Sequence, residues 1–219
     1  MSTLQLVFDL DGTLVDSAPD IHAAVARMLA GEGLPPLDLA TVTSFIGNGL
    51  PKLVERVIVR VGLDMRQHPR LTKATLHHYS AASSDLTRPY PGVVAALTAL
   101  QQAGHLMGVC TNKPVAPARD VLRDLGLAPF FSAVIGGDSL PVAKPDPAPL
   151  HACIAALGGG PTLYIGDSEV DAATATAAGV PFALFTEGYR KTSVADLAPL
   201  MQFSDFDDLP FLLAQTRLS

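Results

Sequence analysis

The sequence has no long hydrophobic run and no cluster of basic residues, and each absence excludes a class of protein. No stretch approaches the ~20 apolar residues of a membrane-spanning helix, so we expect no membrane partner. The net charge is −6 over 219 residues, without a run of lysine or arginine. This balance argues against nucleic acid as a partner. A small phosphate ligand stays compatible with it, because such a site needs only a few cations and a metal.

Cysteines are also scarce. Cys110 and Cys153 stand alone in apolar surroundings, which is typical of buried thiols in a reducing compartment rather than of a disulfide. The first residues show no basic segment followed by a long apolar run, so we expect no signal peptide and a cytoplasmic protein. With 48% hydrophobic residues, the chain can form the packed core of one domain, or of one domain with an insertion.

Residues 4–14 organise the rest of the chain. Their first half is an apolar run that is too short for a helix and is typical of a buried parallel strand. The run ends in Asp9, Asp11, Gly12 and Thr13. In open α/β sheets, ligands bind beyond the carboxyl ends of the strands. Two carboxylates this close raise each other's pKa unless a cation intervenes. Taken alone, however, the pair is equally compatible with a simple turn.

The remaining sequence divides into a helical part and an alternating part. Residues 17–88 contain four helical patterns and no strand, whereas strands and helices alternate from Pro91 onward. The later strands are expected at residues 106–110, 133–135, 162–165 and 182–185. Such alternation indicates a parallel sheet with helices on both faces. We therefore predict an α/β fold, with a Rossmann-like core of residues 1–16 and 89–219 and an all-α helical cap domain, residues 17–88, inserted as a lid.

Polar side chains follow the next two predicted strands. Thr111 and Asn112 come directly after the strand at 106–110. Their hydroxyl and amide can donate to an anion, although both residue types also cap helices. Lys144 follows the strand at 133–135 after a loop, and a lysine is a compact point charge for a phosphate or a carboxylate. In isolation, Lys144 is equally compatible with an ordinary surface position before a helix.

A second pair of acids follows the strand at 162–165. Asp167 stands at the strand tip, and Asp171 lies one helical turn further on. Hard oxygen ligands in this position suit Mg²⁺. Acids are also common at helix N-termini, but that explanation fits Asp167 poorly. Four successive strand ends thus carry an acid pair, a hydroxyl and amide, a lysine and an acid pair, in an order that would surround one point.

The order of these residues resembles the haloacid dehalogenase superfamily of phosphatases. The family's first motif matches residues 9–13, its second Thr111, its third Lys144, and its fourth Asp167 with Asp171. The match covers essentially the whole chain, and the helical insertion corresponds to the family's cap. Within the family, the chain is similar to the phosphoglycolate phosphatases. The stretches that carry this closer likeness are residues 8–17, 46–49, 88–93, 111–114 and 137–145.

The resemblance implies a two-step phosphoryl transfer from a small phosphorylated metabolite, most closely 2-phosphoglycolate. Asp9 would attack phosphorus and form an aspartyl-phosphate. Asp11 would protonate the leaving alcohol and later accept a proton from water. Thr111 and Lys144 would complete the catalytic set by holding the phosphoryl oxygens, and Asn112 would join them in binding the substrate.

The same resemblance implies Mg²⁺ as cofactor. The expected ligands are Asp9, Asp167, the backbone carbonyl of Asp11, and Asp171 either as a ligand or in support of the others. A cation in this position lets a phosphate dianion approach an anionic nucleophile. The presence of Asp11 and Asp167 argues against a dehalogenase of the same fold, which needs neither an acid at that position nor a metal.

A loop in the predicted cap is the candidate for choosing the substrate. Gly47, Asn48 and Gly49 open a helix whose free amides suit a carboxylate, and Lys52 and Arg56 lie on its early turns. We predict that Gly47, Asn48, Gly49 and Lys52 bind the carboxylate of a small phosphorylated acid. The glycines are equally compatible with a hinge or a helix cap.

Several alternatives stay open at this point. A phosphatase or phosphomutase acting on a sugar phosphate, or a pyrophosphatase, would share most of these residues. A non-catalytic protein that binds a phosphometabolite would be expected to have lost some of them, and none is lost. The six histidines do not cluster with the motifs, so no catalytic histidine is expected. The sequence is compatible with a monomer or a homodimer.

Overall fold

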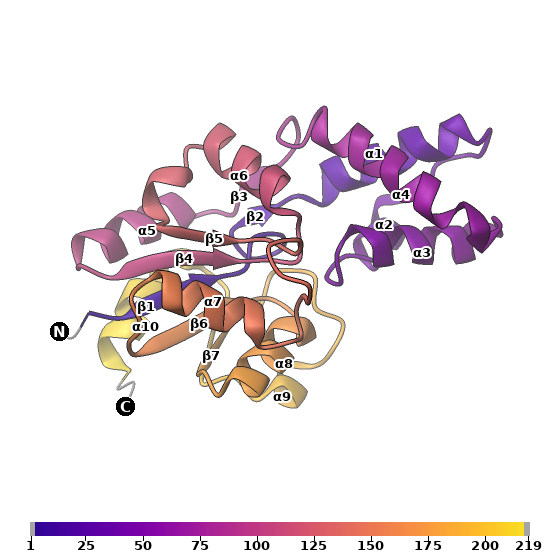
Figure 1. Ribbon diagram of the computed structural model, residues 1–219. Helices are drawn as coiled ribbons and strands as arrows, with labels where there is room; N and C mark the ends of the chain where they lie inside the picture. The colour runs from indigo at the N-terminus through magenta and orange to yellow at the C-terminus, as the bar shows by residue number, and fades with distance from the viewer. Residues whose placement is uncertain (1–2, 217–219) are drawn as a thin grey trace.

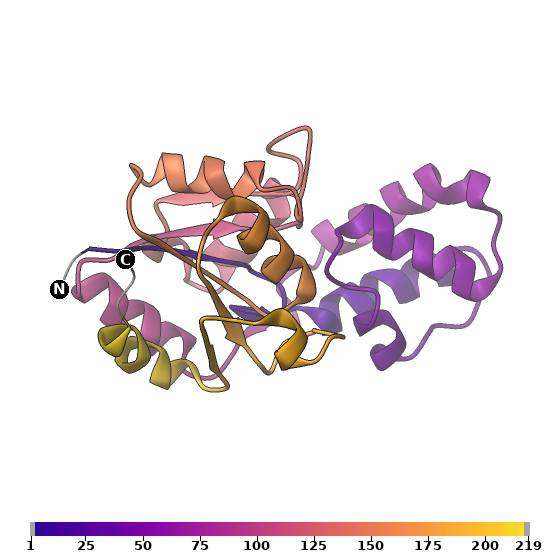
Figure 2. The same cartoon turned by 90° about the horizontal axis from the view of Figure 1, so that it is seen from below.

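The computed structural model describes residues 3–216, which form a sheet-containing core and a helical lobe (Figure 1). Residues 1–2 and 217–219, which fall within the predicted core, lie outside the described part. The lobe projects beyond the carboxyl ends of the strands in both views (Figures 1 and 2). Within residues 3–216, no helix combines the length and the hydrophobicity that crossing a bilayer requires.

The core is built on a parallel sheet with the strand order β5-β4-β1-β6-β7-β8. Its strands are β1 (Gln5–Phe8), β4 (Leu106–Cys110), β5 (Ala133–Ile135), β6 (Thr162–Gly166), β7 (Phe182–Phe185) and β8 (Met201–Phe203). Because β1 pairs with β4 on one side and β6 on the other, its four residues are all buried. The predicted strands are present, and the three-residue β8 adds a sixth that the sequence analysis did not predict.

Helices cover both faces of the sheet, which confirms the predicted Rossmann-like α/β core. Leu6 and Phe8 pack on one face and Val7 on the other, as the two-residue period of a strand requires. The first face is covered by α5 (Val93–Gln102), α6 (Val115–Asp124) and α10 (Leu209–Gln215). The second face is covered by α7 (Ala148–Ala156) and α8 (Glu169–Ala178). Cys110 and Cys153 are free, buried thiols, as expected.

Shorter elements complete the core and the lobe. They are α9 (Val194–Leu197) and the 3₁₀ turns η1 (Met65–Gln67), η2 (Ala128–Phe130) and η3 (Phe206–Asp208). Phe206 of η3 is fully buried against Phe185 of β7, with ring centroids 4.9 Å apart. This contact packs the C-terminal segment that begins with η3 against the sheet.

The helical lobe has a hydrophobic core of its own. Its helices are α1 (Ala18–Gly31), α2 (Leu39–Thr43), α3 (Leu50–Val61) and α4 (His68–Ser80). Val25, Val54, Ile58 and Leu71 are fully buried together in a cluster separate from those of the sheet. The spacing of Val54 and Ile58 places both on one face of α3. The four helices expected between residues 17 and 88 are therefore present, while the domain boundaries themselves stay a prediction.

Two chain segments connect the lobe to the core, and they are fastened to each other. A two-residue strand, β2 (Val15–Asp16), pairs antiparallel with β3 (Arg88–Pro89). The buried carboxylate of Asp20 accepts hydrogen bonds from the backbone N–H of Leu86 at 3.0 Å and from the N–H and hydroxyl of Thr87 at 2.7 and 2.6 Å. Two-residue strands leave no alternation in a sequence, so this ribbon was not predicted.

Candidate active site

The site forms where the central strands end. Because β1, β4 and β6 are parallel neighbours, the residues that follow them emerge at the same edge of the sheet. Asp9 follows β1, Thr111 follows β4, and Asp167 follows β6. Lys144, from the loop before α7, reaches the same point, with its Nζ 3.0 Å from Asp9 Oδ1. The convergence expected from the sequence is therefore present.

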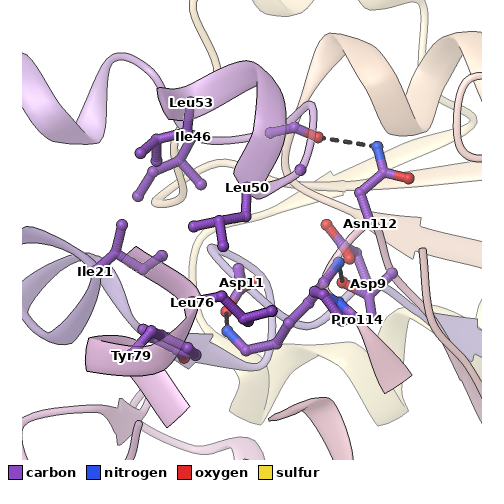
Figure 3. Close-up of a pocket in the computed structure, with 14 residues that line it drawn as sticks. Asp9, Asp11, Ile21, Ile46, Leu50, Leu53, Leu76, Tyr79, Asn112 and Pro114 are labelled. Carbon is purple, nitrogen blue, oxygen red and sulfur yellow. Dashed lines mark hydrogen bonds and ion pairs between the residues drawn. The ribbon is translucent and has the colours of Figure 1, made fainter. Parts of the chain in front are cut away.

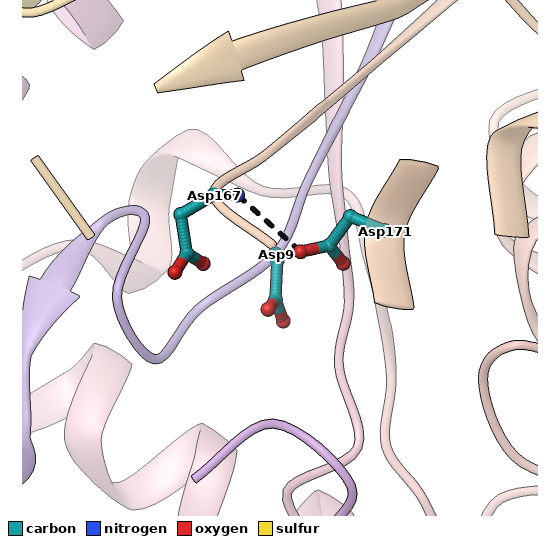
Figure 4. Close-up of side chains that lie close together, drawn as sticks. All are labelled: Asp9, Asp167 and Asp171. Atoms are coloured by element: carbon teal, nitrogen blue, oxygen red, sulfur yellow. Dashed lines mark hydrogen bonds between the residues drawn. The ribbon is translucent and has the colours of Figure 1, made fainter. Parts of the chain in front are cut away.

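Three buried carboxylates lie together at this edge. Asp9, Asp167 and Asp171 each offer an oxygen, and these oxygens lie within 4.8 Å of one another (Figure 4). Asp167 is 1% exposed and Asp171 is fully buried. Burial raises the pKa of Asp9 to about 6 against the attraction of Lys144. Burial also raises the pKa of Asp167 well above its usual range, and the charges of Asp171 and Asp9 add to the rise. These three carboxylates therefore carry more negative charge than the nearby positive charge balances.

Lys144 supplies one cation to this group and contacts three partners there, two through hydrogen bonds and one through an ion pair. Its Nζ lies 2.7 Å from Asp171 Oδ1, 2.9 Å from the Tyr164 hydroxyl and 3.0 Å from Asp9 Oδ1. Burial alone would lower the pKa of this ammonium, but the carboxylates of Asp171 and Asp9 outweigh burial and raise it. Lys144 is therefore a permanent positive charge at the edge of the sheet.

The carboxylate of Asp171 is already fully engaged by neighbouring groups. Its Oδ1 accepts from Lys144 and from the Tyr164 hydroxyl, at 2.7 and 2.8 Å. Its Oδ2 accepts from the hydroxyl of Ser168 at 2.7 Å and from its N–H at 3.1 Å, which caps α8. Burial opposes ionisation, but Lys144 and these hydrogen bonds lower the pKa of Asp171. This geometry favours a supporting position over direct metal ligation.

The remaining acids have the capacity to bind a hard divalent cation. Asp9 Oδ1 is buried and accepts no hydrogen bond within residues 3–216; its 3.0 Å approach to Lys144 is an ion-pair contact. Asp167 is oriented by the Thr13 hydroxyl at 2.9 Å and the Tyr189 N–H at 2.6 Å. Each of its oxygens therefore keeps a free lone pair. Carboxylate oxygens of this kind are the ligands that Mg²⁺ prefers.

Gly12 makes the close approach of these loops possible. Its φ of +87° lies in the region that favours glycine, and a Cβ there would lie 2.6 Å from Asp167 Oδ2. A larger residue would displace either the first loop or the carboxylate. The glycine in the first motif is therefore required by the packing of Asp167 against the β1 loop.

The side chain of Asp11 points to a different group of residues. Its Oδ1 accepts from Lys113 Nζ and from the Ser17 hydroxyl, both at 2.6 Å. Within the described part of the chain, its carboxylate is not among the acids grouped around Asp9. Asp9 and Asp11, two residues apart, thus have different surroundings, as the sequence led us to expect for a pair with different tasks.

A pocket lies between these residues and the helical lobe (Figure 3). Asp9, Asp11, Thr111 and Asn112 line it from the core. The lobe contributes a largely apolar wall, which consists of Ile21, Ile46, Gly47, Gly49, Leu50, Leu53, Leu76 and Tyr79. This edge of the sheet therefore opens toward the lobe.

The predicted substrate loop is only partly at this pocket. Gly47 and Gly49 line it, whereas Asn48 and Lys52 do not. Asn48 Oδ1 accepts from the Arg56 guanidinium at 2.8 Å. Lys52 pairs with Glu55 at 2.6 Å, and its side chain is 47% exposed. The assignment of Lys52 as a substrate ligand stays a prediction that no contact in residues 3–216 supports.

Asn112 holds the pocket together rather than pointing freely into it. Its Nδ2 donates to the backbone carbonyls of Gly47 and Lys144, at 3.1 and 3.0 Å, and its Oδ1 accepts from the Lys144 N–H at 2.9 Å. The first of these bonds joins the core to the lobe loop. Asn112 therefore positions Lys144 and the loop; because it also lines the pocket, its predicted part in binding substrate stays a prediction.

Sequence reasoning gave no role to three residues around the site. Lys113 and Ser17 hold Asp11. Tyr189, from the loop after β7, accepts from the N–H groups of Ser17 and Ala18 and donates to Asp16. Lys113 directly follows Thr111 and Asn112, but its spacing does not show that its side chain is buried beside Asp11. Tyr189 lies far along the chain in a loop without a pattern, and only the fold brings it here.

Comparison with known proteins defines the class to which this site belongs. The family model for haloacid dehalogenase-like hydrolases matches residues 5–179. The chain therefore belongs to the haloacid dehalogenase-like hydrolase family, whose hydrolases generally use a divalent metal, and the buried acid cluster provides a place for one.

Individual relatives narrow the class to phosphoric monoester hydrolases. The chain is 54% identical over 210 residues to a phosphoglycolate phosphatase of Cereibacter sphaeroides strain ATCC 17025, covering 95% of this chain and 96% of the relative. It is 43% identical over 207 residues to one of Rhodobacter capsulatus, covering 94% of each. A crystal structure of a predicted phosphoglycolate phosphatase from Haemophilus somnus superposes with a TM-score of 0.89 at 32% identity, covering 96% of this chain and 97% of that one.

Proposed function

We propose that the protein is a Mg²⁺-dependent phosphatase that hydrolyses 2-phosphoglycolate to glycolate and phosphate. The observation that carries the proposal is the buried cluster of Asp9 and Asp167, of which Asp9 lines the pocket together with a second acid, Asp11. The names of the relatives, which cover nearly the whole chain, supply the substrate. A small substrate agrees with a site that the lobe closes on one side.

Asp9 and Asp167, with the backbone carbonyl of Asp11, would hold the metal. The cation would neutralise the charge between an anionic nucleophile and a phosphate dianion. Asp171 would act through Lys144, since both of its oxygens are already hydrogen-bonded. Lys144 and Thr111 would hold phosphoryl oxygens, Lys144 by exchanging its contact with Asp9 for one with the substrate.

The proposed reaction has two steps. In the first, an Asp9 carboxylate oxygen bonds to phosphorus while the bond to the ester oxygen breaks, and Asp11 gives a proton to that oxygen, releasing glycolate. In the second, a water oxygen attacks the same phosphorus, Asp11 takes the water proton, and Asp9 is released with free phosphate. Asp11 therefore returns to its starting state after each turnover.

We further propose that the helical lobe, residues 17–88, acts as the cap of this site. Its apolar residues Ile21, Leu50, Leu53 and Leu76 face the acids across the pocket (Figure 3). Closing such a wall over the substrate would exclude bulk water and strengthen the interactions of the charged groups. The two short connections at β2 and β3 would be the hinge.

A substrate panel tests the proposed function. Purified protein with Mg²⁺ should hydrolyse 2-phosphoglycolate with a higher kcat/KM than p-nitrophenyl phosphate, glucose 1-phosphate or pyrophosphate. A chelator should remove the activity, and added Mg²⁺ should restore it. A higher kcat/KM for a sugar phosphate or for pyrophosphate, or isomerisation of the sugar phosphate, would replace the proposed substrate with one of these alternatives.

The nucleophile is tested by Asp9→Asn. This change keeps the size of the side chain, so the fold should be retained, but the amide is a poor nucleophile. We expect kcat to fall by at least roughly 10³-fold. Labelled phosphate should also be trapped on the acid-quenched wild type and not on the variant. The mechanism would be falsified if Asp9→Asn kept wild-type turnover.

A further inference from the structure

A second buried lysine lies at the pocket and has no role in the reaction described above. The Lys113 side chain is 4% exposed. Its Nζ lies 2.6 Å from Asp11 Oδ1 and 4.5 Å from the centre of the Tyr79 ring. Asp11 belongs to the core and Tyr79 to α4 of the lobe, so this ammonium lies at the junction of the two parts.

Lys113 makes fewer polar contacts than Lys144 and has more unused donors. An ammonium carries three N–H groups. Lys144 donates to Asp171 and Tyr164 and forms an ion pair with Asp9. Among the described residues, Lys113 Nζ makes one hydrogen bond, to Asp11, and otherwise faces the Tyr79 ring. A buried ammonium with unused donors is suited to a further anionic partner.

The pocket gives that partner a defined place. Within residues 3–216, Lys113 is the only cationic side chain among those that line it. The surrounding lobe residues, such as Leu50, Leu53 and Leu76, are apolar. An anionic group entering this part of the pocket would find one charge-assisted donor and little competing water.

We propose that Lys113 binds the carboxylate of the substrate and so selects phosphorylated acids over other phosphomonoesters. This inference rests on the proposed function. In 2-phosphoglycolate, only the ester oxygen and one methylene separate the phosphorus from the carboxylate. When phosphorus faces Asp9, the ester oxygen faces Asp11. The carboxylate then lies just beyond Asp11, where Lys113 Nζ stands 2.6 Å from the Asp11 carboxylate.

Two neighbours would allow Lys113 to bind the substrate without disturbing Asp11. The Ser17 hydroxyl also donates to Asp11 Oδ1 at 2.6 Å, so Asp11 stays oriented when Lys113 shares its donors. The Tyr79 ring stabilises the ammonium from the lobe side through a cation–π contact. Lys52, which the sequence predicted to bind the substrate carboxylate, is instead paired with Glu55 and does not line the pocket.

The test compares two esters that differ at one group. They are 2-phosphoglycolate and 2-hydroxyethyl phosphate, in which a hydroxymethyl group replaces the carboxylate. Their kcat/KM values are measured for the wild type, Lys113→Gln, Lys113→Met and Lys52→Met. Lys113→Gln keeps a donor for Asp11 and loses the charge. It provides a second measurement if Lys113→Met does not fold.

We expect the Lys113 variants to lower the ratio of the two kcat/KM values by roughly 10- to 100-fold, the loss of one charge-assisted hydrogen bond. Lys52→Met should leave this ratio near that of the wild type. A parallel loss on both esters would overturn the inference and leave Lys113 only a positioning residue for Asp11. If the ratio of the two kcat/KM values fell in Lys52→Met instead, the lobe loop and not Lys113 would select the carboxylate. Failure of the wild type to hydrolyse 2-phosphoglycolate would overturn the proposed function itself, whatever the variants do.

Discussion

The core side and the lobe side of the pocket differ sharply in charge. On the core side, Asp9, Asp167 and Asp171 share one cation, Lys144. The lobe side is the half of the site nearer the lobe, where the core residue Asp11 has a cation of its own, Lys113, against the apolar wall of the lobe. The core side is therefore short of positive charge, and the lobe side is balanced. This difference suits a metal and the phosphoryl group on one side, and recognition of the rest of the substrate on the other.

The same difference appears in the anchoring of the two lysines. Lys144 is held by three partners from β1, β6 and α8 or the residues next to them. Lys113 is held by one carboxylate and one aromatic ring, and the ring belongs to the lobe. Movement of the lobe would thus change the surroundings of Lys113 and leave those of Lys144 in place.

Removing the core cation should have the largest effect. Lys144→Met would leave the buried carboxylates of Asp9 and Asp171 without their cation, and breaking a buried ion pair in this way costs about 3–5 kcal/mol. We expect the free energy of unfolding in a chelator to fall by about that amount, and kcat to fall by roughly 10³-fold because a donor to the phosphoryl group is lost. Urea unfolding and steady-state kinetics measure the two effects.

A double variant distinguishes lost charge balance from lost packing. Asp171→Asn in the Lys144→Met background removes one of the unpaired charges, so part of the lost stability should return while activity stays low. Lys113→Met should cost less stability than Lys144→Met, since it leaves one carboxylate unpaired and Ser17 still donates to it. Equal losses for the two lysines would contradict the difference between the two sides.

The response of the metal-free protein to pH should be the next largest effect. The pKa of Asp9 rises from 3.8 to about 6 on folding, so the folded state binds more protons than the unfolded state between these values. Stability then falls as pH rises through the window from 3.8 to about 6. The expected loss is about 3 kcal/mol for this carboxyl group. Asp171 has a lowered pKa and contributes the opposite slope, but at pH values below this window.

Measurements with Mg²⁺ and with Asp9→Asn isolate the contribution of Asp9 to the pH dependence of stability. Unfolding is measured from about pH 3 to about pH 7.5, limits that bracket the window, in a chelator and in saturating Mg²⁺. The stabilisation by Mg²⁺ should grow with pH, since the cation binds the ionised acids. Asp9→Asn should remove part of the difference in slope in the chelator, and Asp167, whose pKa burial also raises, should account for much of the rest. A metal-free stability that rises through this window relative to Asp9→Asn would show that the acids are not electrostatically strained.

The core side was largely predictable from the sequence, and the lobe side was not. Asp9, Thr111, Lys144 and Asp167 follow apolar runs, and parallel strands bring such positions to one edge whatever the details of packing. The strand at 106–110 and the cluster around Asp9 were therefore accessible to reasoning from order and spacing alone. The positions of Asp171 and Asn112 were also expected, but not the hydrogen bonds that fully occupy them.

The lobe side depends on tertiary contacts that leave no local pattern. Lys52 and Lys113 are both lysines near a motif, and nothing in their spacing shows that one is exposed beside Glu55 and the other buried beside Asp11. That difference arises from the way α4 brings Tyr79 against the core. The ribbon of β2 and β3 and the place of Tyr189 were missed for the same reason.

Tyr189 connects the two sides and offers the smallest and most selective change. Its N–H donates to Asp167 at 2.6 Å, while its hydroxyl donates to Asp16 at 2.7 Å and accepts from the N–H of Ser17 at 2.9 Å. Tyr189→Phe removes only the contacts on the lobe side, because the backbone bond to Asp167 remains. We expect a loss of about 1 kcal/mol in stability, the net value of a typical hydrogen bond.

Tyr189→Phe should therefore affect the kinetics of substrate binding more than the activation by Mg²⁺. Because Asp167 keeps its backbone donor, the Mg²⁺ concentration for half-maximal activity should stay within about twofold of the wild-type value. The start of α1, which loses the hydroxyl, should become more open to proteolysis, and KM should rise while kcat changes little. Gly188→Ala is the matched variant on the other side, since a Cβ there would lie 2.3 Å from the Cβ of Asp167. It should weaken Mg²⁺ activation first. Equal weakening of Mg²⁺ activation by Tyr189→Phe and Gly188→Ala would contradict this division. It would show that the loop after β7 transmits changes at the hinge to Asp167.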